Sequence, residues 1–87
     1  MEIDFNKIKI KNNIIDIRNS YDYNINGIKG SINIPRMLLL SEYDKYIKKD
    51  EVYYLICDNG KVSLSCCRIL NALGYKCYSI KGGIKSI

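Results

Sequence analysis

A cysteine stands between an apolar run and a short polar loop, in the segment Tyr54-Leu-Ile-Cys57-Asp-Asn-Gly-Lys-Val-Ser63. The apolar run predicts a buried strand, and a helix is expected to begin near Ser63. The backbone N–H groups of residues 58–63 can then turn toward the sulfur, and the amino end of the helix adds partial positive charge. A thiol in such surroundings tends to ionise, and the thiolate is the nucleophilic form of cysteine. The segment therefore predicts a sulfur nucleophile, Cys57, inside a cradle of backbone donors.

The sequence contains no histidine and has four cysteines, at positions 57, 66, 67 and 77. No two cysteines have the Cys-x-x-Cys spacing, so we expect neither a zinc site nor a thioredoxin-type redox pair, and no metal or cofactor. The lack of histidine also excludes a Cys-His dyad, so Cys57 has to be activated by its backbone surroundings. Cys66, Cys67 and Cys77 are interpreted as core or surface thiols, and a resolving role is the alternative.

Alternating strands and helices are expected to position this loop. The predicted strands are 14–17, 31–34, 52–56 and 76–80, and the predicted helices are one or two within 37–47 and one over 62–73. This order predicts an α/β fold with a mostly parallel sheet. In such folds ligands bind beyond the carboxyl ends of the strands, which is where Cys57 lies.

Three local features complete this prediction. Asp4 is expected to cap a short helical turn through Ile8 and Ile10. The polar segment 19–26 is expected to be a loop, and Gly74 stands where a left-handed residue would end the helix before it.

The composition of the chain is that of one small globular domain, residues 1–87, with 47% hydrophobic and 26% charged residues. Met1 is followed by acidic residues rather than a secretory signal, and no apolar run approaches the roughly 18 residues that cross a bilayer. We therefore expect a cytoplasmic domain with no membrane partner. The net charge of +5 comes from lysines spread along the chain. We interpret it as solvated surface, or as help in attracting small anions, and expect no nucleic-acid partner because no aromatic-and-basic platform accompanies it.

Five segments follow one another in a recognisable order from about residue 14 to the C-terminus. They are Asp16-Ile-Arg18 with Tyr23, Ile28-Lys-Gly30-Ser-Ile-Asn33-Ile-Pro35, Cys57-Asp-Asn-Gly60-Lys-Val-Ser63, Leu73-Gly74-Tyr75 and Ile80-Lys-Gly82-Gly83-Ile84. Together these segments resemble the single-domain rhodanese family of sulfurtransferases. The resemblance implies a three-layer fold, in which a small, mostly parallel five-stranded sheet is flanked by helices.

The resemblance also implies an activity. Cys57 would take the outer sulfur of thiosulfate or of a persulfide, become a persulfide itself, and pass the sulfur to a thiol or cyanide in a ping-pong cycle. The expected partners are a small anionic sulfur donor, a thiol acceptor and, as a further candidate, a sulfur-accepting protein.

The resemblance gives the other residues supporting roles. The substrate would lie against the loop residues Asp58, Asn59, Gly60, Lys61, Val62 and Ser63. Asp16 and Arg18 would support the pocket. Gly60 permits the tight curl of the loop, and Ser63 is expected both to cap the helix and to donate a hydrogen bond to the sulfur.

Three positions depart from the family's pattern. The family usually has histidine where Gly27 stands and tryptophan where Ile87 stands, and it commonly has arginine where Val62 stands. Lys61 is cationic but does not reproduce a guanidinium fork, and Asp58 places a carboxylate beside the cysteine. We therefore expect the persulfide chemistry to be retained and the efficiency with thiosulfate to be affected.

Two other functions remain as alternatives. The first is a rhodanese-like binding or sulfur-carrier module of low activity, which Val62 and Asp58 favour. The second is a cysteine-dependent phosphatase or arsenate reductase, which shares the strand-loop-helix arrangement. Such phosphatases need arginine six residues after the cysteine, and Ser63 occupies that position.

Overall fold

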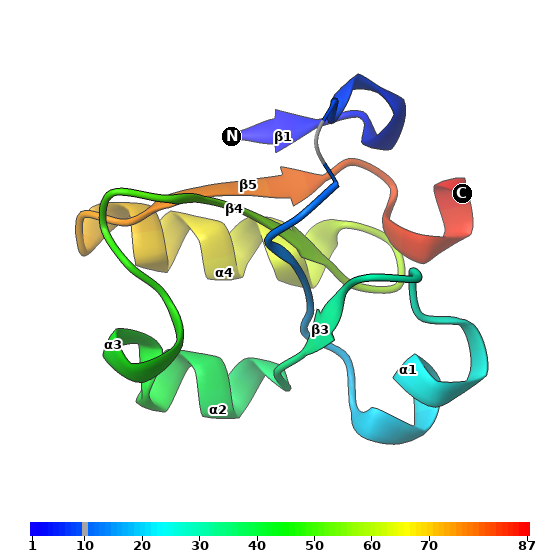
Figure 1. Cartoon of the computed structure of the whole chain (residues 1–87), viewed down its shortest axis with the longest axis horizontal. Helices are drawn as coiled ribbons and strands as arrows, with labels where there is room; N and C mark the ends of the chain where they lie inside the picture. The colour runs from blue at the N-terminus through cyan, green and yellow to red at the C-terminus, as the bar shows by residue number, and fades with distance from the viewer. Residues whose placement is uncertain (10) are drawn as a thin grey trace.

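The structure is a computed structural model that describes residues 1–9 and 11–87 (Figure 1). Its elements in chain order are β1 (Glu2–Ile3), the 3-10 helix η1 (Phe5–Lys7), β2 (Ile14–Asp16), α1 (Ser20–Asn26), β3 (Ile32–Asn33), α2 (Arg36–Ser41), α3 (Tyr43–Tyr46), β4 (Val52–Ile56), α4 (Lys61–Ala72), β5 (Lys76–Ile80) and the 3-10 helix η2 (Gly83–Ser86). Over these residues the sheet has five strands in the order β1-β5-β4-β2-β3, and every neighbouring pair is parallel. The expected α/β fold with a five-stranded parallel sheet is confirmed.

Helix α4 covers one face of the sheet, because its small and apolar residues recur three or four positions apart and fall on one side. Its buried residues are Ser63, Cys66, Cys67 and Leu70. The last three pack in one cluster with Leu55 of β4. Burying a leucine fully stabilises the fold by about 1.5–3 kcal/mol, so this packing fixes α4 against β4. The loop of residues 57–60, which joins the two elements, is fixed with them.

The other face of the sheet is covered by the two ends of the chain. Ile14, Ile56 and Ile80 form a second buried cluster, against which Phe5 of η1 and Ile84 of η2 pack. The C-terminal helix η2 is thereby held close to the carboxyl end of β4. Over the described chain, no helix combines the length and apolar character that crossing a bilayer requires.

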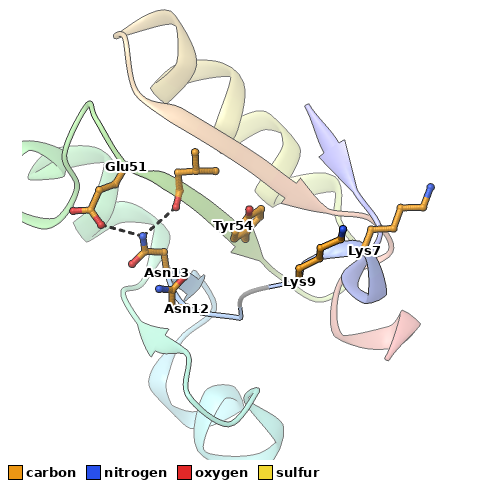
Figure 2. A pocket seen from close by; sticks show the side chains of 7 residues that line it. Lys7, Lys9, Asn12, Asn13, Glu51 and Tyr54 are labelled. Atoms are coloured by element: carbon orange, nitrogen blue, oxygen red, sulfur yellow. Dashed lines mark hydrogen bonds between the residues drawn. The ribbon is translucent and has the colours of Figure 1, made fainter.

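The amino end of this second face is open. Tyr54 of β4 stacks on the Tyr78 ring with centroids 6.1 Å apart. Tyr54, Lys7 and Lys9 line an open pocket of about 420 Å³. Figure 2 shows these side chains. In the same pocket the Asn13 side-chain amide donates to Glu51 and to a backbone oxygen of β4, both at 3.2 Å. This pocket lies at the opposite end of β4 from Cys57 and is separate from the candidate site.

The predicted elements with continuous apolar character are confirmed. Strands 52–56 and 76–80 have the expected bounds, and the helix predicted over 62–73 is α4, which begins at Lys61. The predicted end of that helix is confirmed at Gly74, which has φ +98°. The Gly74 N–H donates to the Asn71 oxygen and the Tyr75 N–H to the Leu70 oxygen, each at 3.0 Å. These two bonds form the Schellman motif, which satisfies the last carbonyls of the helix.

Two local predictions are wrong. The segment 19–26 is not a loop, because Ser20–Asn26 forms α1, capped by the Asn19 side chain, which accepts from the Asp22 N–H at 2.8 Å. Polar composition alone did not distinguish a capped surface helix from a loop. Asp4 precedes the turn Phe5–Lys7, but no side-chain capping bond from it occurs within the described residues. Ile10, which completed that prediction, lies outside the described residues.

Candidate active site

Cys57 follows the last residue of β4, the central strand, and its side chain is 4% exposed. The backbone N–H groups of Gly60 and Ser63 donate to its Sγ at 3.2 and 3.3 Å. The Ser63 hydroxyl oxygen lies 3.3 Å from the same sulfur. The sulfur therefore has three polar contacts at the amino end of α4, where the helix dipole adds partial positive charge.

The loop bends at Gly60, the residue before α4. Gly60 has φ +91°, a conformation that residues with a Cβ rarely adopt, and a Cβ there would lie 2.9 Å from the Gly82 nitrogen. The N–H of the next residue, Lys61, donates to Asn59 Oδ1 at 3.0 Å rather than to the sulfur. The free backbone N–H groups in the first turn of α4 are thus paired partly with the Asn59 side chain and partly with the Cys57 sulfur. The cradle around the sulfur is smaller than the six donors expected from residues 58–63.

Ser63 lies inside the first turn of α4 and does not cap it, so that part of the sequence prediction is wrong. Its hydroxyl instead joins a fully buried network, 2.6 Å from the Ser79 hydroxyl of β5. The Gly60 oxygen lies 3.3 Å from both hydroxyl oxygens, so one hydroxyl donates to the other and the second donates to this carbonyl. Buried hydroxyls need such partners, so the network fixes the position of the Ser63 oxygen beside Cys57. Sequence reasoning missed Ser79, whose only signal is a small polar residue in a buried strand.

The C-terminal helix η2 holds the start of the loop from the other side. The Ile84 N–H donates to the Cys57 oxygen at 2.9 Å, and the Lys85 N–H donates to the Asp58 oxygen at 3.1 Å. Gly83 makes this approach possible, because a Cβ there would lie 2.6 Å from the Asp58 carbonyl carbon and closer still to the Cys57 oxygen. The two bonds fix the carbonyls of residues 57 and 58, and with them the first peptide of the loop.

Asp16 and Arg18 form a buried ion pair beside the loop. Arg18 Nε donates to Asp16 Oδ1 at 3.0 Å and Nη2 to Oδ2 at 2.8 Å, while Nη1 donates to Asn26 Oδ1 at 2.7 Å. Nη1 also lies 3.7 Å from an Asp58 oxygen. The hydrogen bond to Asp16 raises the pKa of Arg18, and the nearby charges of Asp16, Asp58 and Asp22 add to this effect. The pair links β2, α1 and the loop. Its role in supporting the pocket stays a prediction.

A pocket of about 250 Å³ opens above the sulfur. Its lining residues are Ile17, Arg18, Asn19, Asp22, Cys57, Asp58, Asn59 and Val62. Val62 is 45% exposed at its rim. The structure thus brings Asp58, Asn59 and Val62 to the pocket, whereas Gly60 and Ser63 contact the sulfur below it. The Lys61 side chain is exposed and does not line this pocket in the described structure.

Sequence reasoning missed the contribution of α1 to this pocket. Asn19 and Asp22 line it, and both belong to the segment that was expected to be a loop. The asparagine before a potential first helical turn was the signal that could have identified this helix.

The other three cysteines are buried away from solvent. Burial raises the pKa of the Cys66 thiol to about 11 and of the Cys77 thiol to about 12, and raises that of Cys67 as well. These thiols stay neutral near pH 7, as expected for core residues. In the chain that the structure describes, no group of three or more metal-ligating side chains comes together.

Comparison with known proteins identifies the family. The chain matches the sequence profile of the rhodanese-like domain over residues 3–87. It is 31% identical over 71 residues to a tRNA sulfurtransferase of Desulfurococcus amylolyticus, a match that covers 82% of this chain and 14% of that protein. This chain therefore spans only a small part of that relative.

Solved structures show the same similarity. The fold superimposes on a rhodanese-related protein from Thermoplasma volcanium with a TM-score of 0.78 and 31% identity, covering 86% of this chain and 74% of the other. For a structure described as rhodanese with anions from E. coli, the TM-score is 0.74 with 27% identity, covering 87% and 91% of the two chains. The sequence match and the shared fold agree, and the chain belongs to the rhodanese-like domain family.

Proposed function

We propose that this protein is a sulfurtransferase that carries sulfur as a persulfide on Cys57. The observation that supports this proposal best is the environment of the Cys57 sulfur, which accepts from two backbone N–H groups and lies 3.3 Å from one buried hydroxyl oxygen at the bottom of a small pocket. Such donors stabilise negative charge on sulfur without having to reorganise during the reaction.

The cycle has two steps. In the first, the Cys57 thiolate attacks the outer sulfur of the donor and forms a new S–S bond. The S–S bond of the donor breaks, and its electron pair leaves with the donor fragment, as sulfite from thiosulfate or as a thiolate from a persulfide. In the second, an acceptor thiolate or cyanide attacks the outer sulfur, and Cys57 leaves as a thiolate. The cysteine is anionic at the start and the end, so the same donors serve both steps.

The relatives support sulfur transfer as the general chemistry. The tRNA sulfurtransferase relative carries that activity in its name. For this chain we propose a small sulfur donor, a thiol acceptor and a sulfur-accepting protein as partners. All four cysteines are free thiols, which fits the cytoplasmic location that we propose, because a reducing compartment preserves free thiols.

A second candidate is a rhodanese-like module that binds a partner or carries sulfur with little turnover. Two points favour it: Cys57 is almost fully buried, and Val62 lies at the rim of the pocket, at the position where the resemblance led us to expect arginine. Turnover separates the two candidates, because a carrier would be loaded once and release sulfur slowly, whereas an enzyme would cycle.

Sulfur loading tests the proposal directly. After incubation with a persulfide or thiosulfate donor, intact-mass spectrometry should show one added sulfur atom, which cyanide removes. The Cys57→Ser variant should gain none and keep the wild-type circular dichroism spectrum. A Cys66→Ser variant should load as wild type does, which provides a matched control for the loss of a buried thiol. Loading that persists in Cys57→Ser, or no loading of the wild type by any donor, would refute the proposal.

A further inference from the structure

We propose that the pocket above Cys57 selects a persulfide on an organic carrier over thiosulfate, and that Asp58, held by Arg18, is the residue that sets this selectivity. This inference rests on the proposed sulfurtransferase function and concerns its donor. It follows from the charges that surround the pocket, which come from two separate stretches of the chain, residues 17–22 and 57–62.

The charged side chains that line the pocket are one guanidinium, Arg18, and two carboxylates, Asp22 and Asp58. The Asp58 side chain is 64% exposed and lies next to the nucleophile in sequence. Asp22 is half-buried on α1, and none of the ion pairs within the described residues involves it. An anion that enters the pocket therefore approaches two carboxylates.

Arg18 does not offset this charge. Nε and Nη2 bind the fully buried Asp16 carboxylate in a two-point contact, and Nη1 binds Asn26. Each guanidinium nitrogen thus already has a protein partner, and its charge is balanced by Asp16. The remaining attraction of Nη1 is directed at Asp58, 3.7 Å away. This contact favours a position of the Asp58 carboxylate at the pocket wall. It also engages the Arg18 guanidinium, the cation to which a substrate anion would otherwise bind.

The uncharged lining suits an organic group. Ile17 and Val62 provide apolar contacts, and Asn19 and Asn59 provide amides. A pocket of about 250 Å³ has room for an amino-acid-sized carrier. An ammonium group on that carrier would be attracted by the two carboxylates, and thiosulfate has no counterpart to it.

The charges of the sulfur donors distinguish thiosulfate from organic persulfides. Thiosulfate is a dianion at neutral pH, and both of its charges have to enter the pocket with the reacting sulfur. Cysteine persulfide carries an ammonium group and a carboxylate besides its persulfide group, so it has at most a single net negative charge, and its ammonium group can face the carboxylates of the pocket. The net charge of +5 attracts both donors from a distance. At contact the nearest charges dominate, because charges beyond a Debye length of about 8 Å are largely screened at physiological salt.

The reaction with an organic persulfide needs no other reactant. The Cys57 thiolate attacks the outer sulfur of R–S–SH and forms Cys57–S–SH, and the donor's S–S bond breaks to release R–S⁻. A proton stays on the transferred sulfur, and no net oxidation occurs.

The test compares loading of Cys57 by thiosulfate and by cysteine persulfide, as separate kcat and KM values. Wild type should load from cysteine persulfide with at least tenfold higher kcat/KM. In Asp58→Asn the kcat/KM for thiosulfate relative to persulfide should rise about tenfold, mainly through a lower KM, because one carboxylate near the dianion is removed. Asp22→Asn should shift the ratio in the same direction, and Asp58→Glu should keep the wild-type ratio.

Asp50→Asn is the matched control, because it removes the same charge from an exposed position before β4, at the other end of the strand. It should leave the ratio unchanged. A further arm uses a synthetic peptide whose cysteine persulfide is flanked by lysines or by glutamates. Faster loading from the lysine peptide than from free cysteine persulfide would indicate a protein-bound donor, and the reverse order would indicate a small-molecule donor.

The outcomes are distinguishable from a failure of the proposed function. If thiosulfate loads Cys57 as well as the persulfides do, or if neither Asp58→Asn nor Asp22→Asn changes the ratio, the selectivity is refuted while sulfur transfer stands. If no donor loads Cys57, the proposed function itself is refuted.

Discussion

Replacing Gly83 with alanine is expected to slow sulfur loading of Cys57, although the substitution does not change Cys57 itself. Gly83 lies against the loop backbone, and an added Cβ would be 2.6 Å from both the carbonyl carbon and the oxygen of Asp58. Ordinary contact needs about 3.5 Å, so the loop or η2 must move by roughly 1 Å. A shift of that size in the loop would carry the Gly60 and Ser63 N–H groups, now 3.2 and 3.3 Å from the sulfur, out of hydrogen-bonding range.

The size of the effect follows from these contacts. A hydrogen bond to a charged group contributes about 1.5–3 kcal/mol, so losing one donor should slow sulfur loading by roughly ten- to a hundredfold. Stability should fall as well. The left-handed conformation of Gly83, φ +63°, adds strain of about 1–2 kcal/mol to an alanine. Overpacking against the loop adds about 1–3 kcal/mol more.

Gly30→Ala is the matched control, because Gly30 has φ +87° with nothing within 4 Å of a built Cβ. It should show the conformational strain and no loss of loading. Both variants would be compared by the rate of sulfur loading, measured by mass spectrometry, and by urea denaturation. If Gly83→Ala loads Cys57 within threefold of Gly30→Ala, then the contact between η2 and the loop does not position the sulfur, and this reasoning is wrong.

Three further perturbations follow from the site. Ser63→Ala removes the hydroxyl beside the sulfur and keeps the backbone donor, so loading should slow by about tenfold, and an unchanged rate would show that the hydroxyl is dispensable. Val62→Arg adds a cation at the exposed rim and should raise kcat/KM for thiosulfate about tenfold, with Val62→Leu as a control that should show no rise. The raised pKa values of Cys66, about 11, and Cys77, about 12, mean that burying neutral thiols stabilises the fold fully below pH 9. This contribution is lost as the pH rises from 9 to about 11 for Cys66 and to about 12 for Cys77. The free energy of unfolding in reductant should therefore fall between pH 9 and 12, and less steeply in a Cys66→Ala, Cys77→Ala variant.

Local sequence patterns predicted the elements that are buried by their own apolar runs. Strands β4 and β5 are continuous apolar segments bounded by turn residues, and α4 has a regular apolar face that ends at Gly74. In these elements the local preference and the tertiary packing favour the same structure. The position of Cys57 at the carboxyl end of β4 therefore followed from the sequence, as did the turn at Gly60.

The rest of the site depends on contacts between distant segments, which have no local signal. Ser79 contacts Ser63 across sixteen residues. The bonds from η2 to the loop join residues that are 27 apart in the sequence, Ile84 to Cys57 and Lys85 to Asp58. Strand β1 has only two residues and exists because it pairs with β5. Helix α1 is polar, so periodicity did not distinguish it from a loop. Such features are determined by the tertiary fold and not by the residues that form them.

The residues that bind the Cys57 sulfur are different from the residues that determine which sulfur donor reacts. Backbone N–H groups hold the sulfur, so the loop conformation matters there, and that conformation depends on Gly60 and Gly83. The side chains that line the pocket, Asp58 and Val62 among them, point into it without holding the sulfur. Substitutions of Asp58 and Val62 should therefore change which sulfur donor reacts. Substitutions of Gly60 and Gly83 should change whether Cys57 reacts at all. A Val62→Arg variant that lost loading from every donor would contradict this division.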